Sequence, residues 1–212
     1  MDPIYKFIAI EGNIGAGKTT LSKGLSELMG TRLILEGFED NPFLPGFYED
    51  PTRNAFPLEM YFLAERFKQL SEELFNPDLF SQGLVSDYYL EKSLIFARNT
   101  LNEPEYALFR RLYDIMFRQL PKPDLLVYLM VPMEQLQVQI KKRGRSYEQG
   151  IKEDYLAGIQ QVYLDHLSTL KGMRILVLRY GELNFASKSK DLLQIAEVVN
   201  REYPVGISRI DL

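Results

Sequence analysis

The residues from Gly12 to Thr19 have the types and spacing of a phosphate-binding loop. They read Gly-Asn-Ile-Gly-Ala-Gly-Lys-Thr and follow an apolar run. The glycines allow a tight turn whose backbone N–H groups form an anion nest, and the next helix adds its positive N-terminal end. Lys18 would reach the β- and γ-phosphates, and the Thr19 hydroxyl would bind Mg²⁺. The predicted nucleotide-binding residues are Gly12, Asn13, Ile14, Gly15, Ala16, Gly17, Lys18, Thr19 and Thr20.

A cationic run, Lys-Lys-Arg-Gly-Arg, ends at Arg145 and precedes Ser-Tyr-Glu-Gln-Gly. A short basic run is usually solvated surface. In a chain that also carries a phosphate nest, Arg143 and Arg145 around a glycine instead predict a lid at about residues 143–152. Such a lid closes over the transferring phosphates, neutralises developing charge and excludes water.

Two acids stand where predicted strands end, Glu36 after the second strand and Asp87 after the third. Ligands of open parallel sheets bind at the carboxyl ends of the strands. Phosphoryl transfer to an alcohol uses a carboxylate near the nucleophile and an acid beside the metal ion. We therefore expect Glu36 on the nucleophile side and Asp87, with Thr19, on the Mg²⁺ side.

The elements that must position these residues alternate along the chain. Continuously apolar, β-branched runs are typical of strands covered on both faces of a parallel sheet. Alternation with helical patterns predicts a three-layer α/β fold with five parallel strands. The predicted strands are 6–11, 32–36, 83–87, 124–131 and 174–179, and the predicted helices are 18–29, 54–75, 90–117, 133–142, 152–170 and 187–201.

Two segments give weaker signals. Residues 39–51 are rich in proline, which disfavours a long regular element, yet they keep Phe and Tyr side chains of the kind that shape a pocket or pack on a core. Residues 204–212 show no clear pattern.

Composition excludes several classes of function. The 212 residues carry a formal net charge of −4, which argues against a nucleic-acid partner. The chain has no cysteine and one histidine, His166, so thiol catalysis, Cys-based zinc sites and histidine triads are excluded. No segment has the apolar length that spans a membrane, and the first residues do not form a signal peptide. We expect a cytoplasmic protein with no membrane partner.

Several of these runs together resemble the deoxynucleoside kinases, the family of the deoxycytidine, deoxyadenosine and deoxyguanosine kinases. The likeness extends from Phe7 to about Tyr163. It rests on the phosphate loop, on Glu-Gly-Phe-Glu-Asp-Asn-Pro from Glu36, on Phe-Tyr-Glu-Asp-Pro before the first long helix, and on Tyr-Phe-Leu-Ala-Glu-Arg-Phe within it. The lid run Arg-Gly-Arg-Ser-Tyr-Glu-Gln-Gly-Ile is the most family-specific match.

The resemblance implies a single P-loop kinase domain over residues 1–212 that phosphorylates a deoxynucleoside at its 5′-hydroxyl with ATP and Mg²⁺. It also implies a homodimer, as in many family members. The implied catalytic residues are Glu36 as general base, Asp87, Lys18, Arg143 and Arg145. The implied substrate-binding residues are Tyr48 and Glu148 at the sugar 3′-hydroxyl, Arg66, Glu59 and Lys92 near the base, and Phe96 stacked on it.

Three departures from the family pattern affect this reading. Ser86-Asp87-Tyr88 replaces the family's acid-Arg-Ser, so an arginine is missing. Glu59 stands where a base-reading glutamine is usual, and a carboxylate accepts hydrogen bonds but cannot donate them. Lys92 stands near a position where an acid is usual. We expect Glu59, Arg66 and Lys92 to form a rewired charge network that sets base preference, with a slight lean to deoxyadenosine from the loop runs.

Two other functions stay open. A nucleoside monophosphate kinase such as a thymidylate kinase shares the nest and the lid, but it needs extra cations for the acceptor phosphate. The pocket candidates Glu36, Tyr48, Glu59 and Arg66 include two acids, which favours a neutral hydroxyl. A degenerate homologue that binds nucleotide without catalysis is the second alternative, and the retained Lys18 and lid arginines oppose it.

Overall fold

The computed structural model describes residues 1–212 except 38–40, 77–80, 146–147, 149, 182–184 and 186–187, and it leaves the side chain of Tyr48 undescribed. The chain forms two compact units. The first comprises residues 1–35, 78–88 and 122–212, and the second comprises residues 36–77 and 89–121. None of the described helices is long and apolar enough to cross a membrane.

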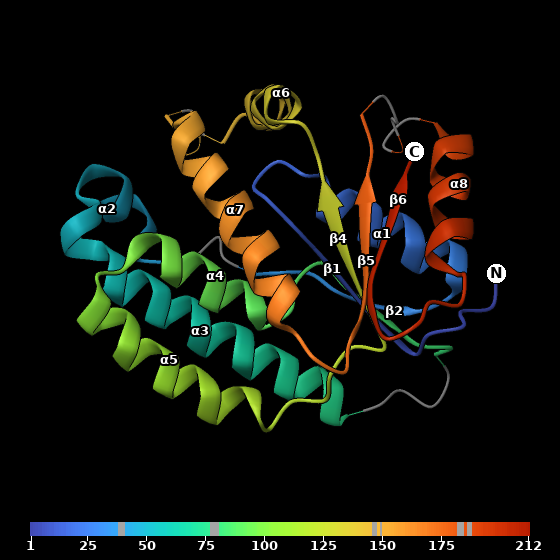
Figure 1. Cartoon of the computed structure of the whole chain (residues 1–212), viewed down its shortest axis with the longest axis horizontal. Coiled ribbons are helices and arrows are strands. Elements are labelled where there is room, and N and C mark those ends of the chain that lie inside the picture. The colour runs from blue at the N-terminus through green and yellow to red at the C-terminus, as the bar shows by residue number, and fades with distance from the viewer. Residues whose placement is uncertain (38–40, 77–80, 146–147, 149, 182–184, 186–187) are drawn as a thin grey trace. The chain divides into compact units, whose positions relative to one another are not determined.

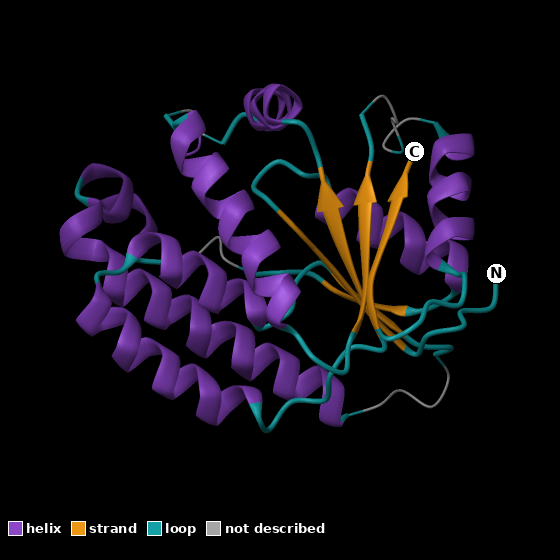
Figure 2. Ribbon diagram, viewed as in Figure 1, coloured by secondary structure: helices purple, strands orange, loops and turns teal. Residues whose placement is uncertain are grey.

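The first unit is built on a parallel sheet with the strand order β2-β3-β1-β4-β5-β6. Figure 2 shows these strands in orange. Nearly all residues of β1, β3 and β4 are buried, which explains their continuous apolar sequence. The strands are β1 (Phe7–Gly12), β2 (Arg32–Ile34), β3 (Leu84–Ser86), β4 (Leu125–Met130), β5 (Arg174–Arg179) and β6 (Gly206–Asp211).

Helices cover both faces of this sheet, as the sequence predicts. Figure 1 shows α8 on one side of the sheet and α7 on the other. Helix α1 contacts α8, and α6 contacts α7. The helices of this unit are α1 (Lys18–Met29), α6 (Met133–Arg143), α7 (Glu153–Thr169) and α8 (Ser189–Val199).

The prediction of five strands is wrong, because β6 is a sixth strand that pairs in parallel with β5. This strand lies at the edge of the sheet, and each of its residues is exposed or only partly buried. An edge strand needs no continuous apolar run, so its sequence shows neither the buried pattern nor a clean alternation.

The second unit is helical. Its long helix α3 (Pro51–Phe75) contacts α2 (Leu44–Glu49), α4 (Glu91–Thr100) and α5 (Glu103–Phe117). The Asp50 carboxylate caps α3 by accepting from the Arg53 backbone N–H at 3.2 Å. Helix α2 lies within the proline-rich segment, which therefore holds a short regular element.

The single helix predicted for residues 90–117 is wrong, because the structure divides it into α4 and α5. Asn102 begins α5 with a capping box in which its side chain accepts from the Glu105 N–H and the Glu105 side chain accepts from the Asn102 N–H. Pro104 lies in the first turn, where its missing N–H costs no helical bond. This cap starts a new helix inside a continuous apolar periodicity.

Candidate functional site

The predicted phosphate loop joins β1 to α1 in the first unit. Gly15 and Gly17 both have φ of +80°, in the left-handed region, and alternate with other conformations to form the nest geometry. A Cβ atom at Gly15 would lie 2.9 Å from the Leu136 carbonyl oxygen and 2.9 Å from the Ile140 side chain. Glycine is therefore required at this position both for conformation and for space.

Side chains from distant segments hold the loop in place. The Asn13 side chain donates to the Leu156 carbonyl oxygen at 2.8 Å and accepts from the Ile14 N–H at 2.8 Å. The Tyr180 hydroxyl donates to the Ala16 carbonyl oxygen at 2.6 Å. Sequence reasoning missed the roles of Leu156 and Tyr180, since neither belongs to the loop motif.

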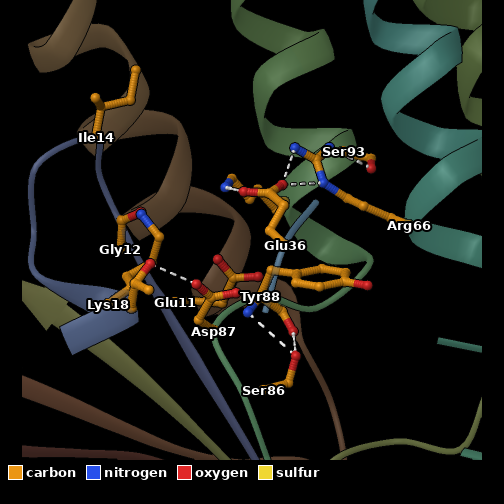
Figure 3. Close-up of polar contacts among 12 residues, drawn as sticks. Glu11, Gly12, Ile14, Lys18, Glu36, Arg66, Ser86, Asp87, Tyr88 and Ser93 are labelled. Carbon is orange, nitrogen blue, oxygen red and sulfur yellow. Dashed lines mark hydrogen bonds and ion pairs between the residues drawn. The ribbon is translucent and has the colours of Figure 1, made fainter. Parts of the chain in front are cut away.

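Lys18 begins α1, and its ammonium group folds back over the loop. It donates to the carbonyl oxygens of Gly12 and Asn13 at 2.9 and 2.8 Å. Figure 3 labels Lys18 and Gly12 next to each other. These bonds hold the cation at the nest. Thr20 is exposed in the first turn of the same helix.

The Thr19 hydroxyl donates to an Asp87 carboxylate oxygen at 2.6 Å. The sequence predicted both residues as ligands of Mg²⁺, and the structure brings their oxygens together. Mg²⁺ prefers oxygen ligands and is usually bound by one or two carboxylates together with substrate phosphates. A hydroxyl and a carboxylate beside a phosphate nest fit that donor set.

The segment Ser86-Asp87-Tyr88 forms a tight bend after β3. The Ser86 hydroxyl donates to the Tyr88 carbonyl oxygen at 2.5 Å, and Figure 3 shows this contact. The Asp87 N–H donates to the Ile34 carbonyl oxygen at 3.0 Å, which extends the pairing of β3 with β2. Ser86 and Tyr88 are fully buried, so the bend is fixed and presents Asp87 toward Thr19.

The lid residues also lie in the first unit. Helix α6 ends at Arg143, and Gly144 follows with φ of +73°. The Arg143 guanidinium donates to both oxygens of the Glu148 carboxylate. Its Nε donates to Oε2 at 3.0 Å, and its terminal Nη2 donates to Oε1. Arg145 donates to the same carboxylate at 3.4 Å. The structure thus brings together Arg143, Arg145 and Glu148, the acid being 5% exposed.

A charge cluster in the second unit is centred on Glu36. Arg66 donates to Glu36 Oε1 through Nε and a terminal nitrogen, both at 2.7 Å, and Lys92 donates to Oε2 at 2.5 Å. Arg66 also donates to the Ser93 hydroxyl at 2.9 Å. Figure 3 shows this arrangement around Glu36. Sequence reasoning did not pair Glu36 with either cation.

The two cations determine the protonation state of Glu36. Burial raises the pKa of this carboxyl, but the charges and hydrogen bonds of Lys92 and Arg66 outweigh that effect and hold its pKa well below the usual range. Glu36 is therefore ionised at any physiological pH, with both oxygens accepting from cations.

Glu59 is a second buried acid of this unit and is 2% exposed. Its Oε1 accepts from the Thr100 hydroxyl at 3.0 Å, whereas its Oε2 accepts no hydrogen bond from any described residue. Burial raises the pKa of Glu59 to about 7, although Arg66, Thr100 and Lys92 each lower it. The sequence singled out this residue, but Thr100 was not expected as its partner.

Two aromatic rings lie under the cations of the cluster. The Lys92 ammonium lies 5.7 Å from the centre of the Phe96 ring, and the Arg66 guanidinium carbon lies 4.7 Å from the centre of the Phe62 ring. Phe96 was predicted to stack on a base, and Phe62 was not predicted. The side chain of Tyr48 lies outside the described part of the structure.

The sequence analysis did not single out one buried acid of the first unit. Glu11, the residue before Gly12, is fully buried and accepts from the Tyr163 hydroxyl at 2.8 Å. Burial and the charge of Glu11 raise the pKa of nearby Tyr128 above its usual range. The sequence does carry a signal for Glu11, because an acidic residue within an otherwise apolar strand indicates a buried charge with a specific partner.

Comparisons with known proteins show what this chain is similar to. A family model described as "Deoxynucleoside kinase" matches residues 8–202. A deoxyguanosine kinase of Bacillus subtilis is 36% identical, over 88% of this chain and 89% of that protein. A deoxyadenosine/deoxycytidine kinase of the same organism is 32% identical, over 93% and 95%. A solved deoxyadenosine kinase from M. mycoides, with dCMP and dCDP bound, is 26% identical and covers 91% of this chain and 98% of that one, with a TM-score of 0.76.

Proposed function

This chain belongs to the deoxynucleoside kinase family, and from that premise we propose that it transfers the γ-phosphoryl group of ATP to the 5′-hydroxyl of a deoxynucleoside. In this reaction the 5′-oxygen bonds to the γ-phosphorus as the bond to the bridging oxygen breaks. The products are ADP and the deoxynucleoside 5′-monophosphate, and the hydroxyl proton passes to a base. The enzyme contributes positioning and charge stabilisation rather than covalent chemistry.

The residues of the first unit take the phosphate side of this reaction. The nest from Gly12 to Gly17 binds the phosphates of ATP through backbone N–H groups, and Lys18 neutralises charge on the β- and γ-phosphates. Arg143 and Arg145 add charge from the lid. Since Glu148 pairs with both arginines, phosphate and Glu148 compete for the same guanidinium groups.

Thr19 and Asp87 are the residues that would hold Mg²⁺. When bound, the ion neutralises charge on the phosphate oxygens and orients them. The Asp87 carboxylate and the Thr19 hydroxyl already lie within hydrogen-bond distance of each other, so the protein needs no large rearrangement to offer both oxygens.

The residues of the second unit take the acceptor side. Glu36 accepts the 5′-hydroxyl proton and enters the step ionised, because Arg66 and Lys92 stabilise its charged form. Phe96 stacks on the base. Tyr48 binds the 3′-hydroxyl and so positions the 5′-oxygen for in-line attack.

The charge balance of the cluster is the observation that favours a nucleoside over a nucleoside monophosphate as the phosphoryl acceptor. Two acids, Glu36 and Glu59, match two cations, Arg66 and Lys92, and Glu36 already occupies bonds from both cations. A nucleoside monophosphate would bring about two further negative charges without added cations to meet them. This balance favours an uncharged nucleoside over the monophosphate that a thymidylate kinase-like enzyme accepts.

The comparisons leave the base open, because both deoxyguanosine and deoxyadenosine kinases occur among the relatives. The lean to deoxyadenosine stays a prediction at this point. A cytoplasmic location, a homodimer and a single kinase domain made of both compact units also stay predictions.

The test is ADP release with Mg-ATP and a panel of the four deoxynucleosides, their ribose forms and their 5′-monophosphates. We expect turnover with deoxynucleosides and none with monophosphates. Turnover with monophosphates alone would move the assignment to the nucleotide kinases. ATP binding without turnover on any acceptor would indicate a degenerate homologue.

A further inference from the structure

Glu59 has a hydrogen-bonding capacity that the described protein does not use. The carboxylate is buried on α3, its Oε1 accepts from Thr100, and its Oε2 accepts no hydrogen bond from any described residue. A buried acceptor without a donor is costly, and more so when it is charged. Such an atom in an enzyme is explained most simply by a donor that arrives with the substrate.

The surroundings of Glu59 indicate a flat, polar-edged group as that donor. Arg66 and Lys92 act electrostatically on this carboxyl, and each of these cations lies over an aromatic ring, Phe62 or Phe96. The same cations bind Glu36, the acid expected at the sugar hydroxyl. The part of a nucleoside that combines a planar ring with N–H donors is its base.

Among the common bases, guanine matches an ionised carboxylate best. Its N1–H and its N2 amino group are adjacent donors on one edge, and a carboxylate offers two acceptor oxygens and no donor. Adenine offers one donor, its N6 amino group, beside the N1 acceptor. Cytosine likewise pairs a donor with an acceptor, and thymine flanks a single N–H with two carbonyl oxygens.

We propose that Glu59 selects guanine, by accepting hydrogen bonds from N1–H and the N2 amino group, so that deoxyguanosine is the preferred acceptor. This inference rests on the proposed nucleoside kinase activity and replaces the slight lean to deoxyadenosine. Adenine would place its N1 lone pair against the carboxylate and leave one carboxylate oxygen without a donor, which sites built for hydrogen bonding reject strongly.

The charge of Glu59 is consistent with this role. With its pKa raised to about 7 by burial, the carboxyl is largely ionised above neutral pH. Arg66 and Lys92 carry two positive charges, of which Glu36 balances one, so the ionised form of Glu59 completes the balance. The same two cations lower the pKa that burial raises.

The experiment compares kcat/KM for deoxyguanosine, deoxyinosine and deoxyadenosine at pH 8 in the wild type, Glu59→Gln and Glu65→Gln. Glu65 is an exposed acid of the same helix and serves as the matched control. Deoxyinosine keeps N1–H but lacks the N2 amino group, so it removes one of the two bonds without any mutation.

The wild type is expected to prefer deoxyguanosine over deoxyinosine by about 10- to 100-fold, the effect of one hydrogen bond to a charged group, and over deoxyadenosine by more. Glu59→Gln pairs a donor with an acceptor, as adenine requires, so the ratio of deoxyguanosine to deoxyadenosine should fall by about 100-fold or more. Glu65→Gln should leave the ratio unchanged.

Failure of this inference differs from failure of the proposed function. Turnover of nucleosides with deoxyadenosine equal to or above deoxyguanosine, or with deoxyinosine equal to deoxyguanosine, would overturn the role of Glu59 and leave the kinase activity in place. An unchanged ratio in folded Glu59→Gln, checked by thermal melting, would do the same. No turnover of any nucleoside by the wild type would overturn both. The deoxyinosine comparison decides the question even if the variant does not fold.

Discussion

The phosphate loop of the first unit and the charge cluster of the second unit are built in different ways. The loop offers backbone groups whose positions follow from local conformation, such as φ of +80° at Gly15 and Gly17. The cluster offers side chains that come from three separate segments, at Glu36, on α3 and on α4. Under the proposed function, the first site binds a generic ligand, phosphate, and the second distinguishes one acceptor from another.

This difference has an energetic side. In the loop, the Asn13 and Tyr180 side chains satisfy the backbone and keep the nest rigid. In the cluster, buried charges are paired at Glu36, but one oxygen of Glu59 has no donor among the described residues. Bringing charges into the protein interior costs desolvation free energy, and removing one partner of a buried pair leaves an uncompensated charge that is strongly destabilising. Substitutions should therefore separate the two regions by which property they change.

Glu36→Gln should have the largest effect, because it damages both folding and activity. It removes the acid that pairs Arg66 and Lys92 and leaves two buried cations, which costs about 3–5 kcal/mol of stability. Urea unfolding at pH 7.5 measures this loss, and exposed Glu49→Gln is the control. Unchanged stability with lost turnover would show that Glu36 acts in catalysis alone.

The pH dependence of Glu36 follows from the same pairs. Its pKa is lower in the folded protein than the ordinary 4.5, so its contribution to stability is complete above that value and is lost as the pH falls toward the folded pKa. The wild type should lose stability below about pH 4.5 more steeply than Glu36→Gln. Parallel curves for the two proteins would contradict the pairing.

Lys18→Ala should change activity alone. Removing a cation from the transferring phosphates is expected to lower kcat by on the order of 10²–10³-fold, while the ratio between nucleosides stays constant. Steady-state kinetics with deoxyguanosine and deoxyadenosine measure both quantities. Exposed Lys23 on the same helix supplies the control, Lys23→Ala. A changed base preference in Lys18→Ala would show that the phosphate loop also influences base selection, and the separation of the two regions would be wrong.

How well the sequence predicts each region follows from the same contrast. Helix α1 and strand β5 were predicted to the residue, the loop between β1 and α1 was predicted, and Asp87, which was expected beside Thr19, does contact it. Local motifs carry these features, because a glycine spacing or an apolar run dictates conformation within a few residues. The start of α5 was also local, in the capping box of Asn102 and Glu105, but the apolar periodicity obscured it.

The ion pairs inside the cluster could not be predicted from local motifs. Glu36, Arg66 and Lys92 were each singled out, but Arg66 lies 30 positions and Lys92 lies 56 positions after Glu36, and only tertiary packing decides which charges meet. Strand β6 was missed for a related reason, since an exposed edge strand pairs through its backbone and needs little from its side chains. That no described residue donates to Glu59 Oε2 is likewise a property of packing.

Base preference should depend on pH, with an effect of about tenfold on each substrate between pH 8 and pH 6. The ionised carboxylate of Glu59 accepts twice and suits guanine, whereas the protonated acid donates once and accepts once and suits adenine. Because the pKa of Glu59 is about 7, deoxyguanosine turnover should fall and deoxyadenosine turnover should rise as the pH falls. Among the described residues, Arg66 on α3 and Lys92 on α4 are the charged groups that act on Glu59.

Initial rates at limiting nucleoside and saturating Mg-ATP measure this ratio, and Glu59→Gln should make it independent of pH. A ratio that changes equally in the variant would assign the effect to another group. The phosphate side provides an internal reference, because it is common to both nucleosides and cancels in the ratio.

The smallest effect concerns stability, where Glu59→Gln should stabilise the free protein at pH 8. The folded pKa of about 7 lies above the ordinary 4.5, so the wild type loses stability as the pH rises from about 4.5 through 7. The loss is on the order of 3 kcal/mol, since the pKa rises from 4.5 to about 7 and each tenfold change in proton affinity corresponds to about 1.4 kcal/mol. Glutamine cannot ionise, so the variant does not lose this stability as the pH rises. Thermal melting should therefore favour the variant at pH 8 and show no difference at pH 4.5, and Glu65→Gln should match the wild type at both. A variant no more stable at pH 8 would mean that Glu59 meets a donor within the protein, and the acid would then have no free capacity for a base.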